Sequence, residues 1–392
     1  MVNHKSGPLS GIRVVELTLG GVGPGAAKIL ADFGADVIKV ESRDRPDGMR
    51  ELDPEKWEKQ QYFAHFNRNK KGIDINLKLP ESQDILHKLI SISDVFIENY
   101  APGVTKRLGA DYDTLVKFNP TLVMVSLSGL GQDGPSSNLL IWGPLLQAYT
   151  GVTNLWNHPY IDGMVGSQSW HPDFFAALFG GYLALGGIYQ RALTGKGAYI
   201  DAPESEIGAA LSGGLYLEYL INKREPQPQG NKSSYMSPHN IYRCAGEDKW
   251  IAIVARDDKD WDNLIKALGN PSWAKDELFS TLEYRLENGD ELDSLIEEWT
   301  QTKSQQDILK ILRDSEVPVG ILMDPKDLLE DEHLNERSFW VSMEGHPHLS
   351  DVKFEGQPIG LSRTPWKYRL PAPIMGGYNE HVLGDLLGNT SD

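Results

Sequence analysis

The stretch "GIRVVELTLGGVGPGAAKILADFGADVIKVE", residues 11–41, decides the fold class. Residues 11–18 form an apolar, β-branched run that predicts a buried strand, and residues 35–41 predict a second one. Between them, residues 24–34 space their apolar side chains as a helix does, with proline in the first turn and glycine at the end. A strand, a helix and a strand in this order indicate a βαβ unit and a parallel sheet.

The same alternation continues along the first half of the chain. Further strands are predicted at residues 94–99, 122–129 and 198–203. Helices are predicted at residues 81–92, 172–194 and 205–221. Strands separated by helices of this length favour a doubly wound layer. We therefore predict an α/β fold with a Rossmann-like large domain.

The second half of the chain predicts a smaller α+β domain. A polar segment rich in Pro, Gln and Ser begins at residue 223 and is typical of a linker. The predicted boundaries are a large domain at 1–222, a small domain with its linkers at 223–334, and a return to the large domain at 335–392. Residues 129–170 are rich in Gly, Pro and Trp with little regular period, which predicts a long functional loop.

Composition excludes several classes of partner. The formal net charge is −17, so the chain has no general attraction for nucleic acid. The chain has one cysteine, Cys244, which favours a reducing compartment. Its side chain is expected to be half-buried and to pack as a small apolar group. Residues 1–11 lack the apolar core of a signal peptide, and the longest uncharged stretch, 174–190, is short for a membrane span. We expect a cytoplasmic protein without membrane contact, and no metal site, because the ten histidines lack ligand spacing.

The first glycine cluster fits a dinucleotide fingerprint. Gly21, Gly23 and Ala26 match G-x-G-x-x-G/A, and Glu41 follows Gly21 by 20 residues, where a ribose ligand stands. An NAD-dependent oxidoreductase is therefore one alternative. Pro24 removes a backbone N–H that a phosphate would use, and no hydride-transfer constellation follows. A glycine turn that packs a helix on the sheet, or that serves CoA, is favoured over NAD.

Two other segments suit a phosphorylated ligand. Lys106 and Arg107 follow a Pro-Gly turn at the start of a helix, where cations and backbone N–H groups favour phosphate. Taken alone, they more often form a solvated helix face. Gly129 and Gly131 follow a strand at the edge where open α/β sheets bind ligands.

Asp173 is the candidate nucleophile. It follows Pro172 at the start of a long helix with few charges, where the helix dipole is expected to lower the pKa of its carboxyl group. Most acidic residues at such positions only stabilise the helix. From this segment alone the structural role is favoured. Two features raise the case for a desolvated, ionised nucleophile: the helix is apolar all round, and Trp170 and His171 lie beside Asp173 without an evident structural need.

Read together, nine segments in the same order resemble the class III CoA-transferases, the CaiB/BaiF family that includes formyl-CoA transferase and carnitine CoA-transferase. They include "PLSGIRVVELT", "GPGAAKILADFGADVIKVE", "SDVFIENYAPGVTKRLG", "GKGAYIDAPESE" and "VPVGILMDPKDLLEDEHLNERSFW", and they cover nearly the whole chain. The resemblance implies that Asp173 forms an aspartyl anhydride and an aspartyl-CoA thioester. It also implies that Arg107 contacts CoA phosphates, that Gly129 and Gly131 line the acyl site, and that ring-shaped subunits interlock as a dimer.

The chain departs from that family in three places. Leu19 and Gly21 stand where several relatives have Gln or His, and Trp142–Gly143 stands where many have Tyr–Asp. "GNKSSY" replaces the glycine run of formyl-CoA transferases. These differences argue against formyl or oxalate substrates. An aromatic-lined acyl pocket is expected instead, from Trp142, Trp156, Tyr160, Trp170 and the neighbouring His171.

The resemblance implies CoA as the only cofactor, entering as an acyl-CoA. We expect succinyl-CoA as donor and an aromatic or branched, benzylsuccinate-like acid as acceptor, in a homodimer or in a heteromer with a paralogous subunit. An acyl-CoA racemase, an intramolecular CoA-transferase and a catalytically silent subunit are the alternatives of the same fold.

Overall fold

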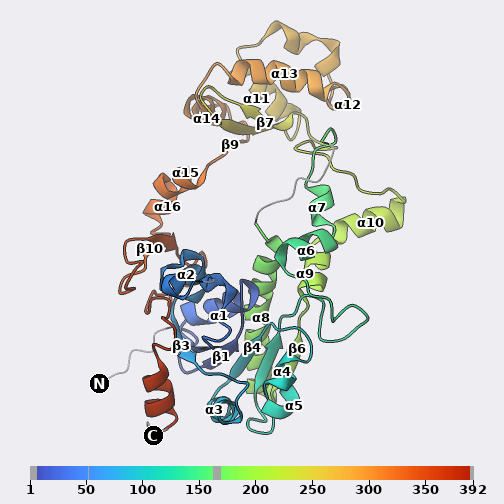
Figure 1. The fold of residues 1–392 in the computed structure, drawn as a ribbon. Helices are drawn as coiled ribbons and strands as arrows, with labels where there is room; N and C mark the ends of the chain where they lie inside the picture. The colour runs from blue at the N-terminus through green and yellow to red at the C-terminus, as the bar shows by residue number, and fades with distance from the viewer. Residues whose placement is uncertain (1–6, 52, 162–168, 389–392) are drawn as a thin grey trace. The chain divides into compact units, whose positions relative to one another are not determined.

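The computed structural model describes residues 7–51, 53–161 and 169–388 (Figure 1). Residues 1–6, which carry part of the signal-peptide argument, lie outside the described residues. The chain divides into a larger unit, Met1–Thr153, Ser167–Arg224 and His333–Asp392, and a smaller unit, Asn154–Gly166 and Glu225–Glu332. Where independently folding domains begin and end, at residues 222 and 334 or elsewhere, stays a prediction.

The larger unit is built on a six-stranded sheet in the order β3-β2-β1-β4-β5-β6, with every neighbouring pair parallel. The strands are β1 Arg13–Leu17, β2 Asp36–Glu41, β3 Lys70–Asp74, β4 Val95–Glu98, β5 Val123–Ser126 and β6 Ala198–Asp201. The predicted Rossmann-like layer is confirmed. The strand order reverses between β1 and β4, so the crevice beyond their carboxyl ends is the place where such sheets bind ligands.

Helices cover both faces of this sheet because successive strand residues point to opposite sides. Val14 of β1 packs with helices α1 (Val22–Asp32) and α8 (His171–Thr194). Val15, the next residue, packs with α3 (Pro80–Ser91) and with the C-terminal π-helix Glu380–Leu386 on the other face.

Helix α8 has one face of small residues and one of bulky residues. Its buried side chains against α1 and the sheet are small, namely Ala176, Ala177, Gly180, Gly181, Ala184 and Gly187. Gly180 permits this close approach, since a Cβ there would lie 2.9 Å from the Ala26 Cβ. The bulky residues between them are exposed, for example Phe179 and Tyr182. The helix is apolar all round in its sequence, but in the chain by itself only the face of small residues is buried.

Two predicted segments differ in the structure. Residues 129–170, expected as a loop, contain α6 (Gly143–Tyr149) and α7 (Val152–Leu155). Pro144 in the first turn and the buried Leu146 stabilise α6 although the segment is too short to show a period. The helix expected at 205–221 is two helices, α9 (Glu204–Leu211) and α10 (Gly213–Asn222), because Ser212 leaves helical geometry between them.

The smaller unit contains an antiparallel sheet of β7 (His239–Arg243), β8 (Trp250–Val254) and β9 (Val319–Ile321). Its helices include α11 Asp258–Ala267, the shorter α12 Leu282–Glu287, α13 Gly289–Thr300 and α14 Gln305–Asp314. Cys244 belongs to its core, and burial raises the pKa of the thiol to about 11.

The remaining elements are short. They are α2 Gln61–Asn67, α4 Val104–Arg107, α5 Tyr112–Leu115, α15 Pro325–Glu330, α16 Glu332–Glu336, β10 Trp340–Ser342 and β11 Lys353–Glu355. Within the described ranges, no helix has the length and apolar character needed to cross a membrane. Over the same ranges, no three His, Cys, Asp or Glu side chains gather as metal ligands would.

Candidate active site

Asp173 lies in the first turn of α8, between two glycine-containing segments. A Cβ on Gly21, at the start of α1, would lie 3.6 Å from its Oδ2, and a Cβ on Gly143, at the start of α6, would lie 3.1 Å from its Oδ1. Asp173 Oδ1 is buried and has no hydrogen-bond partner among the described residues. The two glycines therefore leave room for a ligand atom to approach a carboxylate oxygen that is free to react.

A second carboxyl group contacts Asp173. Glu204 is the first residue of α9, is buried, and shares a hydrogen bond with the Asp173 side chain. Burial raises the pKa of Asp173 to about 6, and burial together with the negative charge of Asp173 raises the pKa of Glu204 well above its usual value. The two carboxyl groups therefore ionise in two steps, and the pair holds its last proton more tightly than an isolated carboxyl group would.

The expectation that the helix dipole lowers the pKa of Asp173 is wrong. The dipole acts on a carboxylate that has lost much of its water, and this desolvation is the largest influence on it. The group remains a competent nucleophile, because a pKa of about 6 still leaves it mostly ionised at pH 7 and above.

Helix α6 places an uncharged polar group in the same region. Gln147 follows Gly143 by one turn, is buried, and has neither amide atom hydrogen-bonded within the described residues. Thr150, which follows α6, lies close to Gly208 of α9, because a Cβ on Gly208 would lie 2.7 Å from the Thr150 Cγ2. Neither Gln147 nor Glu204 was predicted from the sequence to belong to the site. The signal for Glu204 is its place directly after the last parallel strand, at the ligand-binding edge of the sheet.

The predicted aromatic residues divide between the two units. Trp170 directly precedes α8, with its ring centroid 6.2 Å from that of Tyr62, and a Cβ on Gly143 would lie 2.9 Å from its Cγ. Trp142 directly precedes α6 and is exposed.

His171 is half-buried, with Nδ1 2.7 Å from the Ser169 carbonyl oxygen. Tyr160 belongs to the smaller unit, where its hydroxyl lies 3.2 Å from His158 Nδ1. A role for Tyr160 or Trp156 in the acyl pocket stays a prediction.

A cavity of about 400 Å³ opens at the carboxyl ends of β1 and β2, beside the segment that follows β4. Its apolar wall includes Leu17, Leu19, Val40, Tyr100 and Leu108. It therefore occupies the crevice where the strand order reverses.

Three cations line the same cavity, namely Arg45, Lys78 and Arg107. Such cations suit the phosphates of a nucleotide. Arg107 lines the cavity from the last residue of the one-turn helix α4 (Val104–Arg107), not from the start of a helix, and its contact with CoA phosphates stays a prediction. Lys106, its neighbour on α4, is exposed and does not line the cavity.

The remaining predicted glycines have structural reasons. A Cβ on Gly23 would lie 2.6 Å from the Thr18 Cβ, so this glycine lets α1 pack on the strand. Gly131 has a φ of +88°, and the next residue, Gln132, donates its backbone N–H to Asp201 at 2.9 Å. A Cβ on Gly129 would lie 2.4 Å from the Ile141 Cγ2. That Gly129 and Gly131 line an acyl site stays a prediction.

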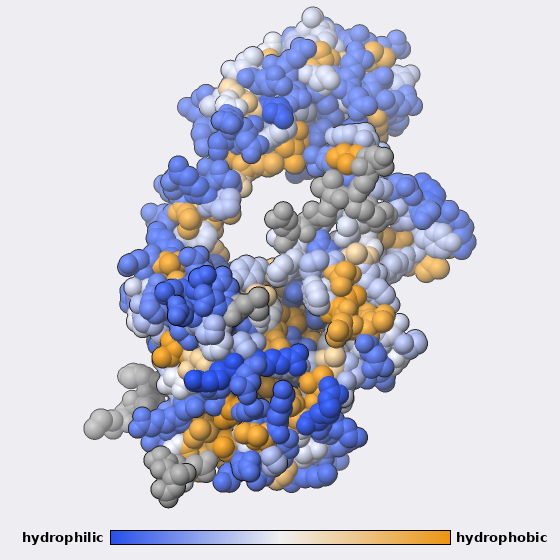
Figure 2. All heavy atoms as spheres, in the orientation of Figure 1, coloured by the Kyte–Doolittle hydropathy of each residue, from blue (hydrophilic) through white to orange (hydrophobic). Residues whose placement is uncertain are grey.

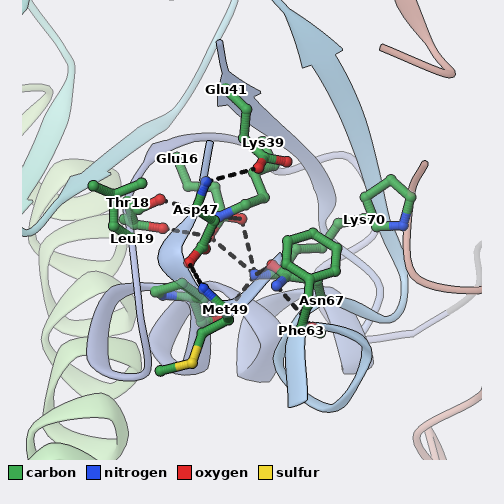
Figure 3. A network of polar contacts seen from close by, with 12 residues as sticks. Glu16, Thr18, Leu19, Lys39, Glu41, Asp47, Met49, Phe63, Asn67 and Lys70 are labelled. Atoms are coloured by element: carbon green, nitrogen blue, oxygen red, sulfur yellow. Dashed lines mark hydrogen bonds and ion pairs between the residues drawn. The ribbon is translucent and has the colours of Figure 1, made fainter. Parts of the chain in front are cut away.

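A buried charge network supports the glycine turn beside Asp173 (Figure 3). Lys39 Nζ donates to the Thr18 carbonyl at 3.1 Å and lies 3.1 Å from Asp47 Oδ2. Asp47 Oδ1 accepts the Gly20 N–H at 2.9 Å. Burial alone would lower the pKa of Lys39, but Asp47 and other carboxylates outweigh it and raise the pKa. The ion pair therefore holds both ends of the turn at residues 18–20.

The acidic residue of the dinucleotide fingerprint is already bonded. Glu41 accepts hydrogen bonds from Arg50 Nε at 2.9 Å and from Arg50 Nη2 at 3.0 Å, one on each oxygen. Both side chains are buried. The ion pair with Arg50 gives Glu41 a structural role, although Glu41 also lines the cavity.

Comparison with known proteins identifies the family. The model described as CoA-transferase family III matches residues 9–379. A Chloroflexus aurantiacus protein named succinyl-CoA–D-citramalate CoA-transferase is 32% identical over 98% of this chain and 95% of its own length. A Mycobacterium tuberculosis protein named as a CoA-transferase is 31% identical over 98% of this chain, which spans 49% of that protein.

A solved structure of a CaiB/BaiF family protein from Brucella suis is 27% identical, with a TM-score of 0.89 over 97% of this chain and 100% of that one. The family model therefore covers the part of the chain that contains the cavity, the sheet and Asp173 at the start of α8. The chain belongs to CoA-transferase family III, the class III CoA-transferases.

Proposed function

We propose that this enzyme transfers CoA from succinyl-CoA to a second carboxylic acid, with Asp173 as the covalent nucleophile. The donor is supported by the names of relatives that act on succinyl-CoA with D-citramalate or L-malate, or on succinate with glutarate. The observation that carries the proposal is the glycine turn, which joins the cation-lined cavity to Asp173.

The proposed acyl-CoA would lie along this turn. Leu19 lines the cavity, and Gly21, two residues later, adjoins the Asp173 carboxylate. A ligand with a phosphorylated nucleotide at one end and an acyl group at the other would contact both. Acyl-CoA has this form, and Arg107 and Arg45 would bind its phosphates.

The chemistry follows from an ionised carboxylate beside a thioester. An Asp173 oxygen attacks the donor carbonyl, CoA thiolate leaves, and a mixed anhydride forms. The thiolate then attacks the aspartyl carbonyl and releases succinate, which leaves an aspartyl-CoA thioester. The acceptor carboxylate displaces the thiolate to form a second anhydride. The thiolate finally attacks the acceptor carbonyl, so the new acyl-CoA leaves and the Asp173 carboxylate is restored.

We further propose that the acceptor is a diacid with an aromatic or branched substituent, resembling benzylsuccinate. The acids in the relatives' names are C4 and C5 dicarboxylic or hydroxydicarboxylic acids, which supports two carboxyl groups. Trp170 lies within reach of the Gly143 segment beside Asp173, and Trp142 precedes it, which supports an apolar substituent.

A second chain is part of the proposal. The bulky face of α8 is exposed, with Tyr182 at 69% and Tyr189 at 68%. Apolar side chains also reach the surface around α6 (Figure 2). Such faces favour burial in an oligomer. The partner would be an identical chain or a paralogous subunit, since relatives are named as alpha and beta subunits of one CoA-transferase. Native mass spectrometry distinguishes a monomer from either dimer.

Trapping with hydroxylamine tests the nucleophile. The enzyme is incubated with succinyl-CoA and then with hydroxylamine, and the peptide that contains Asp173 is analysed by mass spectrometry. We expect a hydroxamate at Asp173, none in Asp173→Ala, and an unchanged yield in Asp133→Asn, which alters an exposed loop carboxylate. An unmodified Asp173 in active enzyme would refute covalent transfer.

The acceptor is tested separately, with citramalate, malate, glutarate and benzylsuccinate as competing acids. We expect new acyl-CoA from a diacid, with benzylsuccinate preferred. Isomerisation of an acyl-CoA without any added acid would instead support the racemase or the intramolecular transferase.

A further inference from the structure

Asp173 has an acidic neighbour and no cationic one in the described part of the chain. Glu204 is 6% exposed, in the first turn of α9, and α9 packs against α8. The influences on the Asp173 carboxyl are burial, a hydrogen bond with Glu204, and a backbone hydrogen bond. Two carboxylates in contact without a counterion share a proton, because the second ionisation meets both desolvation and repulsion.

The charges on the surrounding elements leave this pair isolated. Helix α6, sequence GPLLQAY, carries no ionisable side chain except Tyr149, which is exposed. On α8, the only other charged side chain is Arg191, which pairs with Asp94 at 2.7 Å, and the half-buried His171 precedes Pro172. On α9, Glu206 is exposed. Burial and the contact with Asp173 are therefore the influences that raise the pKa of Glu204.

We propose that Glu204 is a second catalytic residue, a protonated carboxylic acid that donates a hydrogen bond to the reacting carboxyl group of Asp173. This inference rests on the proposed function, in which Asp173 is the covalent nucleophile. Glu204 touches the reacting atoms directly, so it is more than a residue that positions another.

The proposed donor acts when charge appears on Asp173. As the CoA thiolate adds to the aspartyl carbonyl, a C–S bond forms and the carbonyl π electrons move onto the Asp173 oxygen. The Glu204 O–H donates a hydrogen bond to that oxyanion, and the proton stays on Glu204 throughout. When the C–O bond to succinate breaks, the carbonyl reforms. A neutral acid in a dry site can stabilise an oxyanion as backbone donors do.

The resting enzyme also benefits from this arrangement. A hydrogen bond from Glu204 orients the Asp173 carboxylate while Oδ1, which has no partner in the described residues, remains free toward Gly143. An ionised Glu204 would instead repel the Asp173 carboxylate. The enzyme should therefore lose activity when Glu204 loses its proton at alkaline pH.

Three variants test the proposal by steady-state kinetics with succinyl-CoA. Glu204→Leu removes the donor and should lower kcat by about 10²- to 10³-fold, with KM changed by no more than about threefold. Glu204→Gln keeps an N–H donor of the same size and should retain kcat within about tenfold. The matched control, Glu206→Leu, changes an exposed residue of the same helix and should behave as wild type.

The pH profile separates catalysis from structure. The wild type should lose kcat at alkaline pH, and Glu204→Gln should not, because its amide does not ionise. If Glu204→Leu fails to fold by circular dichroism, the comparison of Glu204→Gln with wild type still decides. An unchanged kcat in Glu204→Leu, or an alkaline loss that persists in Glu204→Gln, overturns the role of Glu204.

Hydroxamate trapping at Asp173 distinguishes this failure from that of the proposed function. A wild-type enzyme that traps at Asp173, together with a fully active Glu204→Leu, refutes only the role of Glu204. A wild-type enzyme that turns over without trapping refutes the proposed function, and the role of Glu204 with it.

Discussion

Replacing the proposed nucleophile with asparagine should make the protein more stable. The carboxyl of Asp173 has its pKa raised from 3.8 to about 6, mainly by burial. At pH above about 6, folding must hold a charge in a site with little water, which an unfolded chain does not require. Asp173→Asn has a similar shape and no charge. Its amide oxygen can still accept a hydrogen bond from the protonated Glu204 carboxyl group.

The direction of the pH dependence follows from the two pKa values. Below about pH 3.8, the Asp173 carboxyl group is protonated in both the folded and the unfolded chain, so it costs no stability. Between pH 3.8 and about 6, the unfolded chain loses this proton first, so the free energy of unfolding falls as the pH rises. Each pH unit between the values corresponds to about 1.4 kcal/mol, giving about 3 kcal/mol at most. Sharing of the proton with Glu204 reduces this, so we expect about 1–3 kcal/mol.

Thermal unfolding followed by circular dichroism measures the effect. At pH 7.5, Asp173→Asn should raise the Tm by about 1–4 °C, and the difference should shrink toward pH 4.5. The variant should lose at least about 10³-fold in activity. Asp133→Asn, in an exposed loop, should keep the wild-type Tm and activity. A lower Tm for Asp173→Asn at pH 7.5, or a difference that does not depend on pH, would refute the reasoning.

Three further results are expected. Arg107→Ala should raise KM for succinyl-CoA by about 10- to 100-fold with little change in kcat, because it removes the proposed charge-assisted phosphate contact. Lys106→Ala should change KM little, and equal effects of the two substitutions would contradict the cavity assignment. Gly187→Ala should lower the free energy of unfolding in urea by about 1–2 kcal/mol, since its Cβ would lie 2.4 Å from a core valine of β5. Gly186→Ala, whose Cβ would lie in open space, should raise it by about 0.5–1 kcal/mol. The opposite order would count against the packing of α8. Cys244 should resist iodoacetamide at pH 8 in the native protein and react after denaturation, because burial raises the pKa of its thiol to about 11.

The sheet could be predicted because its signals are local. Strands β1, β2, β4 and β5 are mostly apolar runs, and the helix between β1 and β2 has its own period, so residues 11–41 were sufficient to predict parallel pairing. Strand β3, with the sequence KKGID, has no such run and was not predicted as a strand. Asp173 could also be singled out from local signals, since a proline and an uncharged helix adjoin it in the sequence.

The surroundings of Asp173 could not be predicted, because they depend on distant parts of the chain. Glu204 lies 31 residues later, and its contact with Asp173 requires α8 and α9 to pack. The direction of the Asp173 pKa was predicted wrongly because the helix dipole is visible in the sequence and desolvation is not. Lys106 and Arg107 look equivalent in the sequence, and only the turn of α4 separates them.

The glycine turn at residues 18–21 limits how the enzyme can be redesigned. Leu19 belongs to the cavity and Gly21 to the surroundings of Asp173, and Lys39 and Asp47 brace the backbone between the strand and Gly21. A substitution within this turn that reshapes the cavity would therefore also disturb the surroundings of the proposed nucleophile, whereas one at Arg107 would not. Helix α6 begins at Gly143, on a separate segment, so acceptor preference can diverge there while the recognition of CoA is inherited unchanged.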